Sequence, residues 1–361
     1  RDDENVQIAI HTTAAFGLVA GVLMTLVGVL LSPQILVWMG TPDAVMDESL
    51  TYLQIYFMGS LGSVMYNIFV GTLQAMGDSK HPLYYLIASS IVNVVLDILF
   101  IAVFHAGVGG AALATIISQF LSAFLCMFRL MKNKGCEKLY LRKIRFNWEM
   151  LKQIVRFGLP SGVQNSIIAL ANVVVQSNIN SFGEMAMAGV GAFSKIEGFG
   201  FLPITSFTMA MTTFISQNLG AKQHERAKQS ARFGIFMTAL LAELIGVVVF
   251  IFAPQLIAAF DSNPAVVEIG VEKARTSALF FFLLAYSHAV SAILRGAGKA
   301  VVPMMVMMIF WCVVRVAFLM ITVPLTHSIQ MLYWVYPLTW GLSSLAFLWY
   351  YKKADWLHAL D

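Results

Sequence analysis

Residues 82–105 read PLYYLIASSIVNVVLDILFIAVFH, an apolar stretch that contains a single acidic residue, Asp97, and no lysine or arginine. An apolar helix of about 20 residues is long enough to cross the hydrocarbon core of a bilayer. Ten such stretches follow one another along the chain. They are residues 9–31, 48–73, 82–105, 108–131, 152–180, 187–216, 229–252, 266–294, 302–324 and 329–351. The sequence therefore predicts an all-α integral membrane protein with ten transmembrane helices.

The composition of the 361 residues supports a membrane protein and excludes most other classes. Hydrophobic residues make up 59% of the chain and charged residues 12%, against about 25% charged residues in an ordinary soluble domain. The alternation of apolar and polar residues that is typical of a transmembrane β-barrel is absent. The net charge of +4 does not indicate a nucleic-acid partner, because the location of the charges matters more than their sum.

Motifs for enzymatic chemistry are missing from the sequence. It has no Walker loop, no HExxH pair and no nucleophile elbow, so the chain is not expected to be an enzyme or to hydrolyse ATP. Its three cysteines, Cys126, Cys136 and Cys312, fall in an apolar stretch, a loop and another apolar stretch. That distribution argues against a disulfide or a zinc site, and no cofactor is expected.

The positive charges gather in alternate connections. The segment 129–156 holds nine lysines and arginines, whereas the connections around residues 32–46, 105–108, 181–187, 253–265 and 325–329 hold none. By the positive-inside rule, the basic connections are cytoplasmic, and we expect a multi-pass protein of the inner (plasma) membrane of a bacterium. Lys273 and Arg275 lie near the outer start of the eighth stretch, where their charged ends are expected to reach the interface.

The basic segment also divides the chain. We expect an N-terminal lobe over residues 1–132, a cytoplasmic linker over 133–151 and a C-terminal lobe over 152–361. Trp148 and Leu151 begin a series of apolar residues at helical spacing, which predicts an amphipathic helix on the membrane surface within the linker. The linker is interpreted either as a mechanical coupler between the lobes or as a solvated segment that only sets the topology.

The two lobes share a sequence pattern. A shift of 221 residues aligns Pro33-Gln34 with Pro254-Gln255, Gly77 with Gly298 and Pro82 with Pro303. Matches at loop breakers and helix starts indicate two copies of one bundle, related as parallel repeats. The second copy has two helices more than the first, so we expect the natural protein to carry roughly 75–90 further N-terminal residues and twelve helices in two six-helix bundles.

Five short segments together resemble the multidrug and toxic compound extrusion family of transporters. They are LQAMGDSK at 73–80, NVVLD at 93–97, GLPSG at 158–162, TFISQNLGA at 213–221 and LRGAGK at 294–299. The likeness covers the whole chain, as the third to twelfth helices of the family. It implies two bundles around a central cavity and export of small molecules, driven by a sodium or proton gradient.

Asp97 is the most distinctive polar residue in the apolar stretches. Asn93 lies one turn earlier, with Ser90 on the same face, and the next stretch carries Thr115 and Gln119 on one stripe with Ser118 and Ser122. Their oxygens suit a hard cation, or Asp97 takes up a proton. The resemblance implies that Asn93, Asp97 and Thr115 form a cation or proton site. The alternative is a structural hydrogen-bond network, and no metal is expected beyond a possible Na⁺ at Asp97.

Other polar residues are candidates for a substrate cavity. Ser161, Asn165, Asn172 and Gln176 lie on one face of the fifth stretch, which is interpreted as cavity lining or as polar contact between helices. Gln119 and Glu197 complete the candidate cavity set. Phe199, Phe201, Met209 and Met211 are a possible adaptable apolar wall. The sequence assigns no partners to Lys195, Glu197, Glu243 and Arg315.

The function expected from these features is secondary active efflux of amphipathic or cationic small molecules by alternating access. This multidrug antiporter would use Na⁺ or H⁺ as its coupling ion, act as a monomer and have drugs or metabolites and the lipid bilayer as its partners. The alternative is a flippase for lipid-linked oligosaccharides, which needs a cationic central cavity. A membrane-embedded enzyme is the rival of another class, and it needs Asp-rich motifs that the sequence lacks.

Overall fold

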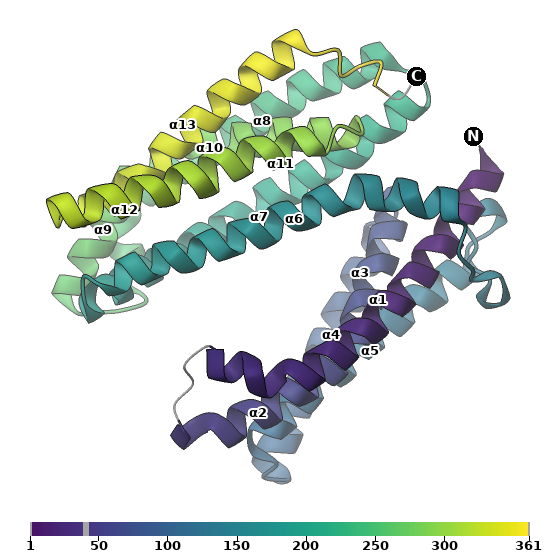
Figure 1. Ribbon diagram of the computed structural model, residues 1–361, viewed down its shortest axis with the longest axis horizontal. Coiled ribbons are helices and arrows are strands. Elements are labelled where there is room, and N and C mark those ends of the chain that lie inside the picture. Colours follow the sequence, from purple (N-terminus) through teal and green to yellow (C-terminus); the bar gives the residue numbers. More distant parts are fainter. Residues whose placement is uncertain (1, 39–42, 360–361) are drawn as a thin grey trace. The chain divides into compact units, whose positions relative to one another are not determined.

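The computed structural model of the protein describes residues 2–38 and 43–359. These residues form helices joined by short loops, with no strand among them, so the predicted all-helical fold is confirmed (Figure 1). The chain divides into two compact units. Unit 1 is Arg1–Val155 and unit 2 is Arg156–Asp361.

Unit 1 is a bundle of long helices. Its elements are α1 (Asp3–Trp38), α2 (Asp43–Met58), α3 (Ser60–Ala75), α4 (Lys80–Asp97), the π-helical η1 (Ile98–Val103), α5 (Gly107–Lys132), and the single turns η2 (Gly135–Glu137) and η3 (Leu141–Lys143). The core lies where α1, α3 and α5 pack together, and Phe69, Leu73 and Leu130 are buried in it.

The first helix differs from the sequence prediction. A break was expected at Ser32-Pro33-Gln34, but α1 continues through Pro33 to Trp38. The hydroxyl of Ser32 donates to the carbonyl of Gly28 at 2.6 Å. Proline is tolerated in a membrane helix where nearby serine or threonine side chains bond the backbone groups that it disturbs. Residues 39–42 of the predicted connection 32–46 lie outside the described residues.

The linker also differs from its prediction. Residues 133–147 contain only the turns η2 and η3, and α6 (Trp148–Asn180) begins directly after them. The side-chain oxygen of Asn147 accepts from the backbone N–H of Met150 at 2.9 Å and so caps the first turn. The expected surface helix of the linker is therefore the first part of a long helix. The cytoplasmic side of this segment and the three-part division of the chain stay predictions.

Unit 2 contains the rest of α6 and the following helices. They are α7 (Glu184–Gly220), α8 (His224–Ala258), α9 (Pro264–Ala278), α10 (Phe281–Gly296), α11 (Val301–Met307), the π-helical η4 (Met308–Val314), α12 (Arg315–Thr326) and α13 (Gln330–Lys353). Helices α7 and α9 approach backbone to backbone, because a Cβ atom on Gly189 would lie 2.8 Å from the carbonyl oxygen of Val266. Only glycine permits that contact.

Seven of the described helices are long and apolar enough to cross a membrane, or up to nine if each bent pair counts as one span. The bent pairs are α2 with α3, at 43°, and α9 with α10, at 54°. The tenth predicted stretch, 329–351, coincides with α13, which is not among these spans. The membrane character is thus supported, whereas the count of ten or twelve helices stays a prediction.

The two bent pairs break at related places. Gly59 separates α2 from α3, and Phe280 precedes α10 after the end of α9. These two positions are separated by the same 221 residues as the sequence pattern. The shared offset agrees with an internal repeat of helix pairs, although the repeat relationship itself stays a prediction.

Candidate functional site

A polar cavity of about 330 Å³ lies inside unit 1, between α3, α4 and α5. Its lining is mostly hydroxyl and amide side chains: Ser63, Tyr66, Asn67, Leu86, Ser89, Ser90, Asn93, Thr115, Ser118, Gln119 and Ser122. The structure thus brings Asn93, Thr115 and Gln119 to one cavity. Their role in binding stays a prediction.

The hydroxyls of α5 are held by their own helix. Thr115 donates to the carbonyl of Ala111 at 3.0 Å, and Ser118 donates to the carbonyl of Ala114 at 2.8 Å. A hydroxyl that donates a hydrogen bond to the backbone can still accept one through the lone pairs of its oxygen. The α5 wall of the cavity therefore offers oxygen acceptors, which suit a cation better than an anion.

Helix α3 supplies residues that the sequence analysis missed. Ser63 donates to the side-chain oxygen of Gln119 across the cavity, and Asn67 donates to the carbonyl of Ser63 at 2.8 Å. Ser63 and Asn67 are four residues apart, so they lie on one face of the helix. This four-residue spacing could have indicated the two residues from the sequence. The stretch 48–73 contains several polar residues, however, and only the structure shows which of them line the cavity.

Asp97 lies one turn beyond Asn93, at the end of α4, where the helix widens into η1. It is not among the residues that line the cavity. The Oδ1 atom of Asp97 and the Nδ2 atom of Asn93 are both buried and have no hydrogen-bond partner among the described residues. A buried polar atom left without a partner costs about 1–3 kcal/mol, and π-helical turns frequently occur at functional sites.

The candidate cavity residues of α6 lie on an exposed face. Ser161 is half-buried, and Asn165, Asn172 and Gln176 are exposed. Gln176 donates to the side-chain oxygen of Asn180 at 2.8 Å. The stripe is a polar surface of α6, and its role as cavity lining stays a prediction.

Unit 2 contains a cluster of buried charges around one tyrosine. Lys273 on α9 and Arg315 on α12 are only 4% and 3% exposed. The Lys273 ammonium lies 3.8 Å from the centre of the Tyr336 ring, and the Arg315 guanidinium lies 4.5 Å from it. Glu197 on α7 interacts electrostatically with both cations.

Hydroxyl groups hold the two cations in place. The Lys273 ammonium donates to Ser277 at 3.1 Å, and Arg315 donates to Thr339 at 2.8 Å. The expectation that Lys273 reaches the interface is wrong, because its charged end is fixed inside the bundle, whereas Arg275 is exposed. Tyr336 and Thr339 were missed as partners, since they lie on α13, far along the chain from either cation.

The remaining charged residues of the apolar helices also have neighbours. The carboxylate of Glu243 accepts from the backbone N–H of Phe282 at 3.3 Å, beside the break between α9 and α10. The Lys195 ammonium lies 5.6 Å from the centre of the Phe260 ring. Neither contact forms part of a cavity described here, so both are interpreted as structural.

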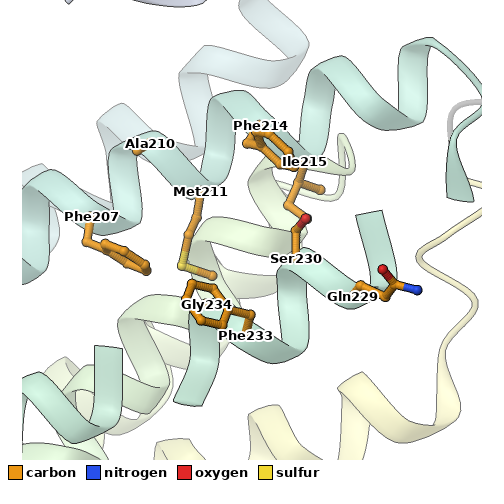
Figure 2. Close-up of a pocket in the computed structure, with 9 residues that line it drawn as sticks. All are labelled: Phe207, Ala210, Met211, Phe214, Ile215, Gln229, Ser230, Phe233 and Gly234. Carbon is orange, nitrogen blue, oxygen red and sulfur yellow. The ribbon is translucent and has the colours of Figure 1, made fainter. Parts of the chain in front are cut away.

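An apolar groove of about 420 Å³ runs between α7 and α8 (Figure 2). Met211 lies beside Gly234 in it, with Phe207 and Phe233 nearby and Ser230 and Gln229 toward the polar end. A Cβ atom on Gly234 would lie 2.5 Å from the terminal carbon of Met211, so glycine makes room for this side chain. Of the predicted apolar wall, Met211 lines the groove, whereas Phe201 packs against His288 with ring centres 5.5 Å apart.

A charged contact outside the apolar helices fixes the start of α4 to the end of α5. Asp78 accepts from His81 at 2.8 Å and from Arg129 at 3.1 Å. Partial burial raises the pKa of Asp78, but the hydrogen bonds from His81 and Arg129 outweigh it, and the pKa lies below its usual value of 3.8. This carboxylate therefore stays ionised and binds the loop to α5.

Comparison with known proteins identifies the family. The MatE family model matches residues 1–99 and 160–321. The probable multidrug resistance protein YoeA of Bacillus subtilis is 27% identical over 365 residues, covering 98% of this chain and 78% of that protein. The probable multidrug resistance protein YpnP of the same organism is 31% identical over 291 residues, covering 81% of this chain and 65% of that protein.

Solved structures show the same fold. The crystal structure of MATE in the bent conformation matches with a TM-score of 0.88 and 21% identity, covering 97% of this chain and 84% of the other. A MOP superfamily transporter from Pyrococcus furiosus matches with a TM-score of 0.90 and 22% identity, covering 98% and 80%. The family match confirms the resemblance seen in the short motifs. The chain therefore belongs to the MatE family of multi-pass membrane transporters, which are not enzymes.

Proposed function

We propose that this protein is a secondary active exporter of amphipathic or cationic small molecules, a multidrug antiporter driven by a Na⁺ or H⁺ gradient. It acts as a monomer in the inner (plasma) membrane of a bacterium, with the linker 133–151 on the cytoplasmic side. Support for the substrate class comes from relatives that are described as probable multidrug resistance proteins.

One observation carries the coupling part of the proposal. Asp97 and Asn93 each have a buried polar atom without a described partner, and Asn93 borders a cavity rich in oxygen acceptors. A carboxylate in a membrane helix costs about 2.5–3.5 kcal/mol on insertion scales, so it is retained where a bound cation or proton compensates it. Asn93, Asp97 and Thr115 form the proposed coupling site.

Ion binding at this site biases a conformational equilibrium. A cation attracted to Asp97 and to the oxygen of Thr115 favours the packing of α4 on α5 that keeps these groups together, and its release favours another packing. Substrate contacts are proposed at Gln119, on the wall of the same cavity, and at Glu197 and the polar face of α6.

Burial of the cations argues against the flippase alternative. A pyrophosphate group needs cations that open into a cavity, but Lys273 and Arg315 are buried and already bonded to Ser277 and Thr339. Export of amphipathic molecules requires no such open cations, so it remains the better account.

The test is transport by the purified protein in lipid vesicles, with a fluorescent organic cation as substrate and a Na⁺ or a proton gradient imposed separately. Asp97→Asn keeps the shape but removes the negative charge, so gradient-driven export is expected to stop. Asp47→Asn, which changes an exposed carboxylate of α2, is the matched control and is expected to export normally. Undiminished gradient-driven export by the Asp97→Asn protein would refute the coupling site.

A further inference from the structure

A second polar cavity in unit 1, of about 610 Å³, lies between the beginning of α1 and the part of the linker formed by η3 and the residues that follow it. Its lining is strongly polar and consists of Glu4, Gln7, Ile8, His11, Thr12, Arg142, Lys143, Arg145, Phe146 and Asn147. All of these residues belong to unit 1. The coupling and substrate sites proposed above use none of them.

The walls of this cavity are held together by specific hydrogen bonds. His11 is 4% exposed, and its Nε2 atom accepts from the backbone N–H of Tyr140 at 3.0 Å. Gln7 donates to the carbonyl of Cys136 at 2.9 Å. The hydroxyl of Thr12, also buried, accepts from the backbone N–H of Asn147 at 3.3 Å. These hydrogen bonds hold the linker against α1 on both sides of the basic residues, so specific contacts fix the walls of the cavity.

The charge of the cavity favours an anion. Arg142, Lys143 and Arg145 lie within four positions of the linker, and none of them forms an ion pair with a described residue. The Lys143 ammonium lies 4.8 Å from the centre of the Tyr140 ring. Glu4 contributes one negative charge to the lining, which leaves the positive charges in excess.

Apolar residues beside the cavity indicate where it lies. Phe146 and Trp148 stack with ring centres 5.9 Å apart, and Trp148 is 71% exposed although it is large and apolar. Tyr140 and Leu141 are exposed on the same linker. Aromatic residues next to lysine and arginine are typical of the interface between membrane and water, so this combination favours a position of the cavity at the depth of lipid headgroups.

We propose that this cavity binds the phosphate group of an anionic phospholipid, with Arg142, Lys143 and Arg145 as its cationic ligands and with the acyl chains beside Phe146 and Trp148. Guanidinium groups bond phosphate oxygens in pairs, and basic recesses next to membrane helices are suited to anionic headgroups. A bound lipid joins the linker to α1, in addition to the hydrogen bonds of His11, Gln7 and Thr12.

A soluble phosphate compound carries the same phosphate group as a phospholipid, and the experiment separates these two ligands. The purified protein in neutral detergent is titrated with phosphatidylglycerol, with phosphatidylcholine and with glycerol 3-phosphate. Native mass spectrometry counts the bound molecules, and the unfolding temperature is followed in parallel. Phosphatidylglycerol alone is expected to bind and to raise the unfolding temperature.

The matched variants are Arg142→Gln with Arg145→Gln, and the control Lys352→Gln with Lys353→Gln. The control removes two exposed charges from the end of α13, in unit 2. We expect the two arginine substitutions to weaken phosphatidylglycerol binding about 30-fold, which is the combined contribution of two basic residues near a membrane surface. The control substitutions are expected to leave this binding unchanged.

Several results would overturn the proposal. Equal loss of lipid in both double variants would show attraction by overall charge and no site. Binding of glycerol 3-phosphate as tight as that of the lipid would assign the cavity to a soluble ligand. If the Arg142→Gln, Arg145→Gln protein fails to fold, the second variant is Arg142→Lys with Arg145→Lys. This variant keeps the charge but loses the paired hydrogen bonds, so a smaller loss of affinity is expected. Unchanged affinity would refute the assignment of the arginines as phosphate ligands.

Discussion

The ammonium nitrogen of Lys273 lies 3.8 Å from the centre of the Tyr336 ring, inside unit 2. A cation over an aromatic ring gains about 2 kcal/mol or more when it is removed from water. The same ring faces the guanidinium of Arg315 at 4.5 Å, and the Glu197 carboxyl interacts electrostatically with both cations. Helices α7, α9, α12 and α13 are therefore joined by one charged cluster.

Removal of the Lys273 charge should destabilise unit 2. Lys273→Met leaves Glu197 with Arg315 but loses the contact of the ammonium with the Tyr336 ring, so it is expected to lower the free energy of unfolding by about 2 kcal/mol. Arg275→Met, two residues along the same helix but exposed, should have little effect. The double variant Lys273→Met, Glu197→Gln should lose further stability, because it leaves the buried Arg315 without its acidic neighbour, as measured by thermal or denaturant unfolding. A double variant as stable as Lys273→Met would mean that Glu197 is not a partner of the two cations.

Acidification should weaken the contact of Asp78 with His81 and Arg129. The pKa of Asp78 is lower in the folded protein than its ordinary value of 3.8, so its contribution to stability is present above that value and is lost as the pH falls through the folded pKa. The contact is partly exposed and is worth about 0.5–1 kcal/mol. Asp78→Asn should therefore be less stable than the parent at pH 7, and the difference should shrink as the pH falls below 3.8 and disappear below the lowered pKa of the folded protein. A difference that persists in acid would contradict this.

Two glycines of α8 should respond differently to alanine. A Cβ atom on Gly246 would lie 2.2 Å from the backbone oxygen of Ala278, whereas one on Gly234 would lie 2.5 Å from the flexible end of Met211. Gly246→Ala should destabilise the protein by about 1–3 kcal/mol, because backbone must move. Gly234→Ala should be tolerated within about 1 kcal/mol, since Met211 can turn away and alanine favours a helix. Unfolding of both variants measures the contrast.

The Thr115 hydroxyl should distinguish the coupling ions. If Na⁺ drives transport, Thr115→Val removes an oxygen ligand, and the Na⁺ concentration for half-maximal export should rise about tenfold, as expected from roughly 1.4 kcal/mol for one lost contact. If protons drive transport, the variant should keep its response to pH. Thr51→Val on α2 is the control, because the Thr51 hydroxyl also donates to its own helix and Thr51 does not line the cavity; vesicle transport is the measurement.

The side of the membrane on which the linker lies can be tested by labelling. A cysteine placed at Asn133, with Cys136 replaced, should resist an impermeant thiol reagent added outside intact cells, because the nine lysines and arginines of residues 129–156 favour the cytoplasmic side. The same cysteine should react after the cells are opened. Rapid labelling from outside would reverse the predicted orientation.

Helical spacing alone was enough to find one wall of the polar cavity. Thr115, Ser118 and Gln119 lie on one stripe of a single helix, and a period of 3.6 residues places them together without knowledge of the neighbours. Asn93 joins them because α4 and α5 are consecutive helices with a short connection. Contacts of this kind are local in the chain, which makes them readable from the sequence.

Contacts between distant segments were not readable in this way. Nothing near Lys273 in the sequence indicates that it is buried, since its partner ring comes from Tyr336 on α13 and its nearest charges from Glu197 and Arg315 on other helices. The continuation of α1 through Pro33 was missed for a related reason: in water proline ends helices, but packing and side-chain bonds sustain the helix here.

The π-helical turn η1 has a torsional consequence for Asp97. A π turn holds one residue more than an α turn over the same height, and each residue of an α-helix accounts for about 100° of rotation. Conversion of Ile98–Val103 to α geometry would therefore swing the face of α4 that carries Asn93 and Asp97 by roughly that angle about its own axis. A change of helical pitch at this segment would therefore alter the direction in which the proposed ion ligands of α4 face relative to α5.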